Sequence, residues 1–303
     1  MALHRLEDRE QDTGRKNRLL SLVLLIASVL ILLYPVVSTV WNDYQNSQVA
    51  RIYEEEVGSV ESPDALADIR RRAEDYNSYL DASGHHYRPE DPADPVYQDY
   101  LTQLLPSERS TVLGRISIPD IGVELPIYHG TRDNVLYRGA GHMYGSDLPI
   151  GGEGNTAAIT AHTGMVNASM FDNLYKLEES QPVYISVLGE TLRYRMTGSE
   201  VVKPEDYDAV TYEEGVDKLV LITCTPYGIN SDRLLVTAVR DHAPLGAEEE
   251  PGGWQPQLSW WMKLDLAIIA LIIAIALWAT WRNRRNRRRQ EEAREAAASH
   301  LPR

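Results

Sequence analysis

Long apolar runs lie near both ends of the chain, and short alternating runs fill the region between them. Residues 19–40 hold 22 positions without a charged side chain, which is enough to cross the hydrocarbon core of a bilayer. A second apolar run at residues 264–281 has a pair of tryptophans near each of its ends, as in interfacial belts. The pattern predicts two transmembrane helices, at residues 19–40 and 260–281.

Basic residues indicate how these spans are oriented. Arg15, Lys16 and Arg18 precede the first span, and the run RNRRNRRR follows the second from Arg282. The positive-inside rule then predicts that both termini are cytoplasmic and that residues 42–258 lie outside the membrane. A cleaved signal peptide is the alternative for the first span, and a buried core helix for the second. The Arg-rich tail also resembles a nucleic-acid patch, but beside a span it favours lipid headgroups.

The region after the first span predicts helix and then loop. Apolar residues recur near every 3.6 positions in residues 44–81, with Ser62 or Asp64 as a candidate N-cap, which predicts a helical stalk or collar. Residues 82–96 contain three prolines and predict a loop. His85 and His86 are adjacent there, but no further ligands have metal-site spacing, so we expect them to be solvated loop residues.

From residue 113 onward the pattern changes to short alternating runs separated by turns. Within this region only residues 170–177 predict a short helix. Many short strands with few helices are typical of a barrel or a sandwich. The runs that predict strands are GRISIPDIGVELPIYHG, NTAAITAH, PVYISV, TLRYRMTG, DKLVLITC and RLLVTAVR.

Composition narrows the class of protein. The chain is 43% hydrophobic and 24% charged, which is typical of a globular protein. Its net charge is −14 although both ends are basic, so the acidic excess lies between the spans. Such a head repels nucleic acid and anionic lipid. Cys224 is the only cysteine, which excludes an internal disulfide and leaves either a reactive thiol or a buried, inert one.

The surroundings of Cys224 favour a reactive thiol. It follows the buried run LVLIT and precedes a loop, and Arg233 begins the next strand nine residues later. An antiparallel pair would bring these two residues together, and a thiol nucleophile needs a base or cation and a donor for the oxyanion. His162 ends another predicted strand and is a candidate base because imidazole titrates near neutrality. His129 and His142 also follow strand-like runs, so spacing alone leaves the base open.

The run LITCTPYGINSDRLL, from Leu221, resembles the signature of the sortases, whose motif is Thr-Leu-x-Thr-Cys with an arginine downstream. Thr223 and Cys224 match the motif, while Val220 and Leu221 occupy its first two positions. The runs GRISIPDIGVELPIYHG and GAGHMYGSDLPIGGEGNTAAITAHTG are also similar in order and spacing. The resemblance covers about residues 95–242, and together with the two spans it is similar to class C, or pilus, sortases.

The resemblance implies a mainly β fold, a sortase-type eight-stranded β-barrel with short helices, an N-terminal helical segment and two flanking transmembrane helices. Cys224 would be the nucleophile, His162 the general acid/base, Arg233 the transition-state or substrate clamp, and Thr223 would line the site. The implied reaction cleaves an LPxTG-like sorting signal through a thioacyl enzyme. A pilin lysine amine then takes the acyl group, without a metal or cofactor.

Class C sortases commonly carry a lid with an Asp-Pro-aromatic tip. The candidates are Asp91 and Asp94, each followed by proline, with Tyr97 one place late for the aromatic position. Residues 89–100 would then form either a lid, with Asp94 or Tyr97 near the pocket, or a plain linker.

Three other functions stay open: a sortase that anchors surface proteins to peptidoglycan amines, a non-catalytic membrane scaffold, and a cysteine hydrolase. The expected partners of the sortase are LPxTG-bearing pilins or surface proteins, a lysine amine acceptor and the cell membrane, with the catalytic domain extracellular.

The predicted segments are a cytoplasmic N-terminus (1–18), a transmembrane helix (19–40), a helical stalk with a possible lid (41–110), the catalytic barrel (111–243), a linker (244–259), a second transmembrane helix (260–281) and an Arg-rich cytoplasmic tail (282–303).

Overall fold

The computed structural model of the chain describes residues 2–60, 62–86, 88–246 and 254–299. Residues 247–253 of the predicted linker and residues 300–303 of the predicted tail lie outside the described residues. Residues 38–257 form one compact unit, called the head below. The helices of the chain are α1 (Ala2–Gly58), α2 (Pro63–Ser83), α3 (Pro95–Tyr100), α4 (Asp133–Leu136) and α5 (Trp260–Ser299), with short 3-10 helices at Pro119–Ile121, Leu174–Lys176 and Tyr207–Ala209.

The centre of the head is a closed eight-stranded barrel with the order β1-β2-β3-β4-β7-β8-β6-β5. Closure pairs every strand on both sides, so no edge is left for association with other chains. Two pairs of adjacent strands are parallel, β2 with β3 and β4 with β7, and the other six pairs are antiparallel. The strands are β1 (Val112–Ile118), β2 (Val123–His129), β3 (Ala140–His142), β4 (Thr156–Thr160), β5 (Pro182–Val187), β6 (Glu190–Val202), β7 (Lys218–Thr225) and β8 (Asp232–Arg240).

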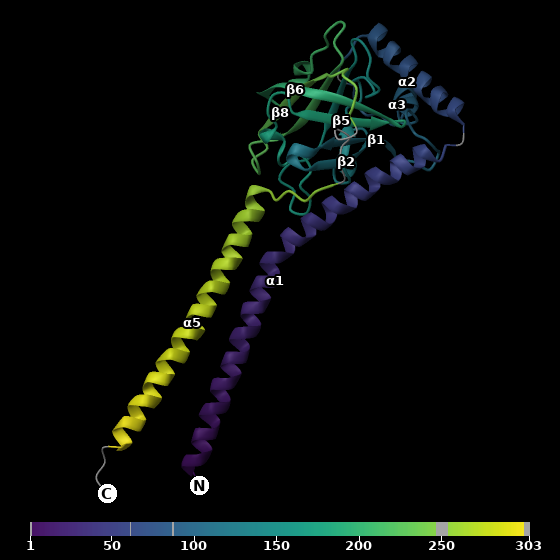
Figure 1. The fold of residues 1–303 in the computed structure, drawn as a ribbon. Helices are drawn as coiled ribbons and strands as arrows, with labels where there is room; N and C mark the ends of the chain where they lie inside the picture. The colour runs from purple at the N-terminus through teal and green to yellow at the C-terminus, as the bar shows by residue number, and fades with distance from the viewer. Residues whose placement is uncertain (1, 61, 87, 247–253, 300–303) are drawn as a thin grey trace. The chain divides into compact units, whose positions relative to one another are not determined.

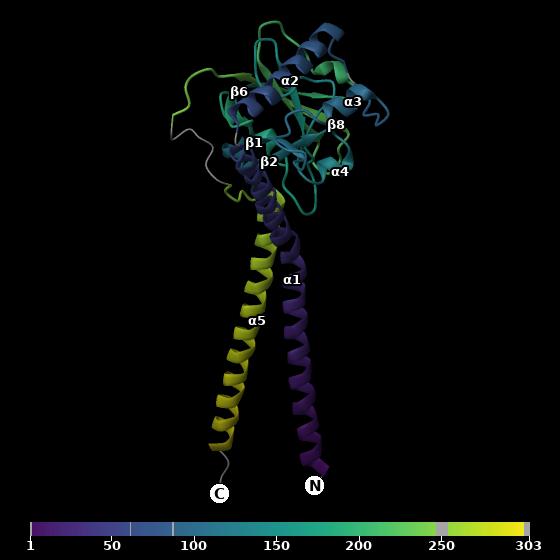
Figure 2. The same cartoon turned by 90° about the vertical axis from the view of Figure 1, so that its right-hand side faces the viewer.

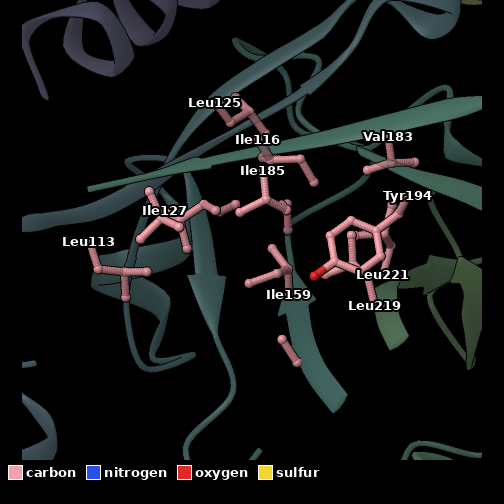
Figure 3. Packing of buried hydrophobic residues seen from close by; sticks show 14 of the residues in the cluster. Leu113, Ile116, Leu125, Ile127, Ile159, Val183, Ile185, Tyr194, Leu219 and Leu221 are labelled. Atoms are coloured by element: carbon pink, nitrogen blue, oxygen red, sulfur yellow. The ribbon is translucent and has the colours of Figure 1, made fainter. Parts of the chain in front are cut away.

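The barrel interior is filled with branched aliphatic side chains from facing strands. Ile116, Ile159, Ile185 and Leu221 are fully buried and point toward one another inside the barrel (Figure 3). The Tyr194 ring closes one side of this cluster, and its hydroxyl donates to Asp217 Oδ1 over 3.0 Å. Burying these side chains supplies the main driving force for folding, at about 1.5–3 kcal/mol for each large aliphatic group.

Helices α2 and α3 lie on one side of the barrel (Figure 1). The side chains of Ile69, Ala73, Tyr76 and Leu80 recur at helical spacing along α2 and belong to the barrel's own hydrophobic cluster. Figure 2, in which this side faces the reader, shows α2 lying across the strands. The helix therefore packs onto the barrel as one amphipathic element.

The C-terminal part of α1 is fastened to the barrel by Tyr53. Its side chain is buried, and its hydroxyl donates to the carbonyl of Leu113 at 3.0 Å and accepts from the amide of Leu188 at 3.1 Å. Arg115 of β1 also forms an ion pair with Glu54 at 3.0 Å. One helix turn thus contacts both β1 and the β5–β6 turn.

Two helices are long and apolar enough to cross a membrane, Leu19–Gly58 and Trp260–Gln290. Both contain the apolar runs identified in the sequence, and both leave large aliphatic side chains exposed. These two apolar helices indicate that the protein associates with a membrane. Both helices extend beyond the predicted spans, because α1 continues to Gly58 and α5 to Ser299.

Several elements differ from the sequence prediction. The helix expected over residues 44–81 is broken into α1 and α2, and Ser62 is the N-cap of α2 without a side-chain cap hydrogen bond. Of the short helix expected at residues 170–177, only Leu174–Lys176 forms, as a 3-10 turn. The three-residue strand β3 is too short to give an alternating signal, so no pattern in the sequence predicts it.

His85 is not the solvated loop residue that the sequence predicted. Its side chain is only 9% exposed, and its Nε2 lies 2.8 Å from Asp147 Oδ1. The imidazole also stacks on the ring of Tyr212 at 3.9 Å between centroids. The tertiary fold buries this residue by bringing distant segments onto it, which no local pattern reports. His86 is exposed, as expected.

Candidate active site

Cys224 lies near the end of β7, directly across from Arg233 of β8. The two residues are partners in the antiparallel register, as the predicted hairpin required. The turn between the strands starts after Thr225 and ends before Asp232. Cys224 is half-buried at this end of the barrel.

His162 reaches the same end of the barrel through the parallel pairing of β4 with β7. Thr160 is the register partner of Ile222, and the amide of Ala161 donates to the Ile222 carbonyl at 3.1 Å. Continuing this register by two residues brings position 162 alongside position 224. Three adjacent strands, β4, β7 and β8, therefore lead to the predicted site: Cys224 lies on β7, Arg233 lies on β8, and His162 follows the end of β4 by two residues.

Thr223 joins the two parallel strands. Its side chain is buried, and its hydroxyl donates to the carbonyl of Ala161 at 2.8 Å. This hydrogen bond fixes the backbone that leads into His162 against the backbone that leads into Cys224. The structure thus gives the Thr223 hydroxyl a contact with protein backbone, one residue away from each of the two candidate catalytic side chains.

Burial sets the protonation state of His162. Removal of the imidazole from water lowers its pKa below the usual 6.5, and the negative charge of Asp133 partly opposes that change. The Nε2 atom is buried and has no hydrogen-bond partner among the described residues, while the ring of Tyr137 lies 5.3 Å from the imidazole. The imidazole is therefore neutral at pH 7 and can accept a proton.

Arg233 is held by the loop that precedes it. Its Nη1 donates to the carbonyls of Asn230 at 3.3 Å and Asp232 at 3.0 Å. Among the described residues, Nε and Nη2 make no hydrogen bond, so these donors can serve a substrate oxygen. Nearby, Lys203 forms an ion pair with Asp232 and lowers the pKa of that carboxyl.

Asp172, which the sequence analysis did not single out, connects the loops that follow His162 and Cys224. Its buried carboxylate accepts from the hydroxyl of Thr163 at 3.1 Å and from the amide of Gly164 at 2.8 Å. Tyr227 also donates to it, and burial together with this carboxylate raises the pKa of the phenol. The residue lies in MFDNLYKL, which reads only as a short helix, so no local signal marks it.

The membrane-proximal part of α1 contacts the loop that begins at His162. Asn42 Nδ2 donates to the carbonyl of Asn167 at 2.7 Å, and the amide of Ser169 donates to Asp43 Oδ1 at 2.9 Å. Burial raises the pKa of Asp43 to about 6, and Ser169 opposes that change. The loop is therefore held between α1 on one side and the carboxylate of Asp172 on the other.

The segment predicted as a possible lid is folded around α3. Asp94 caps this helix, because its Oδ1 accepts from the amide of Val96 at 2.9 Å. Tyr97 is buried against Tyr100 and Tyr144 and donates to Glu90. No hydrogen bond or ion pair of these described residues joins Asp94 or Tyr97 to Cys224, His162 or Arg233. The lid role of residues 89–100 stays a prediction.

The other histidines that follow strand-like runs have structural surroundings. His142 is fully buried, where Tyr100 approaches its Nδ1 at 2.9 Å and the Asp147 carbonyl approaches its Nε2 at 2.7 Å. Burial lowers the pKa of His142 to about 4 and that of His129 to about 3. Within the described part of the chain, no three His, Cys, Asp or Glu side chains gather as a metal site.

Comparison with known proteins identifies this arrangement. A family model described as the sortase domain matches residues 116–241. The lid mutant of sortase A from Corynebacterium diphtheriae is 42% identical with a TM-score of 0.58, and the match covers 62% of this chain and 100% of that one. The chain belongs to the sortase family. Sortases are cysteine transpeptidases, which agrees with a half-buried cysteine that pairs in register with an arginine.

The similar sortases carry the names of more than one class. Sortase C-1 from Actinomyces oris is 43% identical with a TM-score of 0.55, covering 59% of this chain and 99% of that one. Sortase A from Bacillus anthracis is 29% identical over 129 residues, which is 43% of this chain and 60% of that protein. This sortase spans only 53–60% of the curated relatives that it matches.

Proposed function

We propose that this sortase is a membrane-anchored transpeptidase that cleaves an LPxTG-like sorting signal and joins it to a lysine amine of a pilin. The observation that carries the proposal is the register of β4, β7 and β8, in which Cys224 pairs with Arg233 and the end of β4, two residues before His162, pairs with β7. The Actinomyces oris neighbour, which is named a sortase C-1, supports class C. The basic residues on the terminal side of both apolar runs support an extracellular head with cytoplasmic termini.

The first half of the proposed reaction forms a thioester. The neutral His162 accepts the thiol proton of Cys224, and the sulfur attacks the threonine carbonyl of the sorting signal. Arg233 donates to the oxygen that becomes negative in the tetrahedral intermediate. The His162 imidazolium then protonates the amine that leaves as the C–N bond breaks, so the proton from sulfur leaves with that amine.

The second half transfers the acyl group. A neutral lysine amine attacks the thioester carbon, His162 takes the amine proton, and the Cys224 thiolate departs and regains that proton. The products are an isopeptide bond and the free enzyme. The alternative acceptor is a peptidoglycan amine, which the name sortase A of several relatives favours. A lid at residues 89–100 would exclude water from the thioester.

The test uses the full chain in detergent micelles with an LPxTG peptide and a lysine-bearing pilin, followed by mass spectrometry. We expect a thioacyl adduct on Cys224 and a lysine-linked product, and neither in Cys224→Ala. We expect His162→Gln to lower the acylation rate by about 10²–10⁴-fold, because a positioned acid/base supplies that factor. His86→Gln, a change at an exposed histidine, is the matched control and should act as wild type.

Different failures of this test have different meanings. Turnover by Cys224→Ala would remove the thiol mechanism, and an inert thiol in wild type would favour the scaffold. Hydrolysis without transfer in wild type would favour the cysteine hydrolase. Transfer to a peptidoglycan amine but not to the pilin would establish the cell-wall alternative.

A further inference from the structure

A polar cavity of about 420 Å³ lies beside the loop that begins at His162. One of its walls is α1, which contributes Asn42, Gln45 and Asn46. The loop contributes Met165, Asn167 and its neighbours, the segment after α4 contributes Tyr137 and Arg138, and Thr111 and Tyr128 also line the cavity. All of these residues belong to the head. The reaction described above assigns no task to this cavity.

The cavity adjoins the imidazole of the site. Tyr137 lines the cavity, and its ring lies 5.3 Å from the His162 ring between centroids. Met165, which also lines it, is only three residues after His162. The Tyr137 ring is thus shared between the cavity and the surroundings of the His162 imidazole.

The chemistry of the lining matches a peptide backbone. Four side-chain carboxamides line the cavity, Asn42, Gln45 and Asn46 from α1 and Asn167 from the loop, and each carries both donors and an acceptor. Arg138 adds a guanidinium, stacked on the Tyr128 ring at 4.6 Å, which suits a carbonyl or carboxylate. The lining contains no carboxylate, so nothing in it repels peptide carbonyl oxygens.

The reaction requires an acceptor site on this side. His162 protonates the leaving amine and later takes the proton of the attacking amine, so both amines must pass through the space beside its imidazole. An extended lysine side chain places its nitrogen about 6 Å from its own backbone. A backbone held in the cavity therefore puts the amine near the thioester, with the side chain passing the exposed Tyr137 ring.

We propose that this cavity binds the acceptor, a peptide segment whose side chain carries the attacking primary amine. The inference rests on the proposed transpeptidase function. The α1 carboxamides and Asn167 hydrogen-bond the segment's backbone, while Arg138 binds one of its carbonyl or carboxylate oxygens. The shared chemistry fits a lysine segment of a pilin and an amine-bearing stem peptide of peptidoglycan, so both enter the test.

The test measures the two half-reactions separately on the full chain in detergent micelles. Single-turnover mass spectrometry gives the rate of thioacyl formation with an LPxTG peptide. The thioacyl enzyme is either hydrolysed by water or transferred to the acceptor, and the ratio of the two products at increasing acceptor concentrations gives the acceptor KM. This measurement is made once with a pilin lysine peptide and once with a stem peptide. The test variant is Gln45→Ala/Arg138→Gln. Its matched control is Gln48→Ala/Arg109→Gln, which removes the same groups outside the cavity.

We expect the test variant to raise the acceptor KM, and this fold-change should exceed the fold-change in its acylation rate by at least tenfold. The control variant should have the wild-type values of both. The acceptor that shows this response identifies the source of the amine. An acceptor KM within twofold of the control, in both arms, would overturn the acceptor site while thioacyl formation still supported the transpeptidase. A wild type that forms no thioacyl enzyme would remove the transpeptidase and the acceptor site together.

Discussion

At the scale of single residues, Asp172 shows how a group without a sequence signature organises the site. Its carboxylate gathers three donors from two loops, Thr163 and Gly164 after His162 and Tyr227 after Cys224. Gly164 has φ of +76°, a conformation that favours glycine, so the turn brings its amide toward the carboxylate at low cost. Asp172 is therefore a positioning residue, because it links the loops that follow His162 and Cys224.

Asp172→Asn should lower the kcat of transpeptidation by about 10–100-fold with little change in the donor peptide's KM. In the variant, an amide nitrogen would face one of the hydrogen-bond donors that now share the Asp172 carboxylate. A hydrogen bond to a charged group contributes about 1.5–3 kcal/mol, and part of this would be lost. Steady-state kinetics with the LPxTG peptide would check this. Asp208→Asn, at an exposed residue, is the control. A fall in melting temperature with kcat and KM intact would show a purely structural role.

At the scale of elements, the contact between α1 and the barrel depends on few polar groups. Tyr53 is 2% exposed, and its one hydroxyl satisfies a carbonyl of β1 and an amide of the β5–β6 turn. Arg115 is buried between Glu54 of α1 and Glu124 of β2, and burial raises the pKa of Glu124 in spite of this arginine. The helix thus docks on a specific part of the barrel.

Tyr53→Phe should lower the free energy of unfolding by about 1–3 kcal/mol, because it leaves two buried backbone groups without a partner. Denaturant unfolding followed by circular dichroism would measure the loss. Tyr79→Phe removes a hydroxyl from a ring that is 44% exposed and should change the unfolding free energy by less than about 0.5 kcal/mol. Equal effects of the two substitutions would show that the Tyr53 hydroxyl does not stabilise the docked helix.

At the scale of the whole molecule, buried histidines make the stability of the head depend on pH. Burial lowers the pKa of His142 to about 4, while in the unfolded chain it returns to about 6.5. The unfolded chain therefore gains a proton that the folded head does not bind as pH falls below 6.5. The stabilisation from this group is complete above pH 6.5 and is lost as pH falls toward 4.

His142→Gln should flatten the fall in stability between pH 6.5 and pH 4 by roughly 3 kcal/mol, the equivalent of its pKa change. Melting curves of wild type and variant across this range would show the difference. Comparing the two isolates His142 from the buried carboxyls of Asp147 and Asp217, whose raised pKa values act in the opposite sense. His86→Gln should keep the wild-type slope, and an unchanged slope in His142→Gln would contradict the assignment.

The barrel was largely predictable because most of its strands have a local sequence pattern. Alternating runs bounded by turns predicted seven of the strands, and a short loop with antiparallel strands predicted that Cys224 and Arg233 would be partners. The two apolar helices were readable from length alone. By contrast, β3 is too short for a period, and the break between α1 and α2 interrupts a pattern that reads as continuous helix.

The sequence by itself determined seven of the eight barrel strands, the apolar helices and the pairing of Cys224 with Arg233, because each depends on residues close together in the chain. Only the tertiary structure decided that the strand leading to His162 lies next to the strand of Cys224, since β4 and β7 pair in parallel across a connection of more than 50 residues. The same holds for Asp172, for the burial of His85 and for the cavity beside His162. Their surroundings are built by segments far apart in the chain, and such contacts produce no periodic pattern in the sequence.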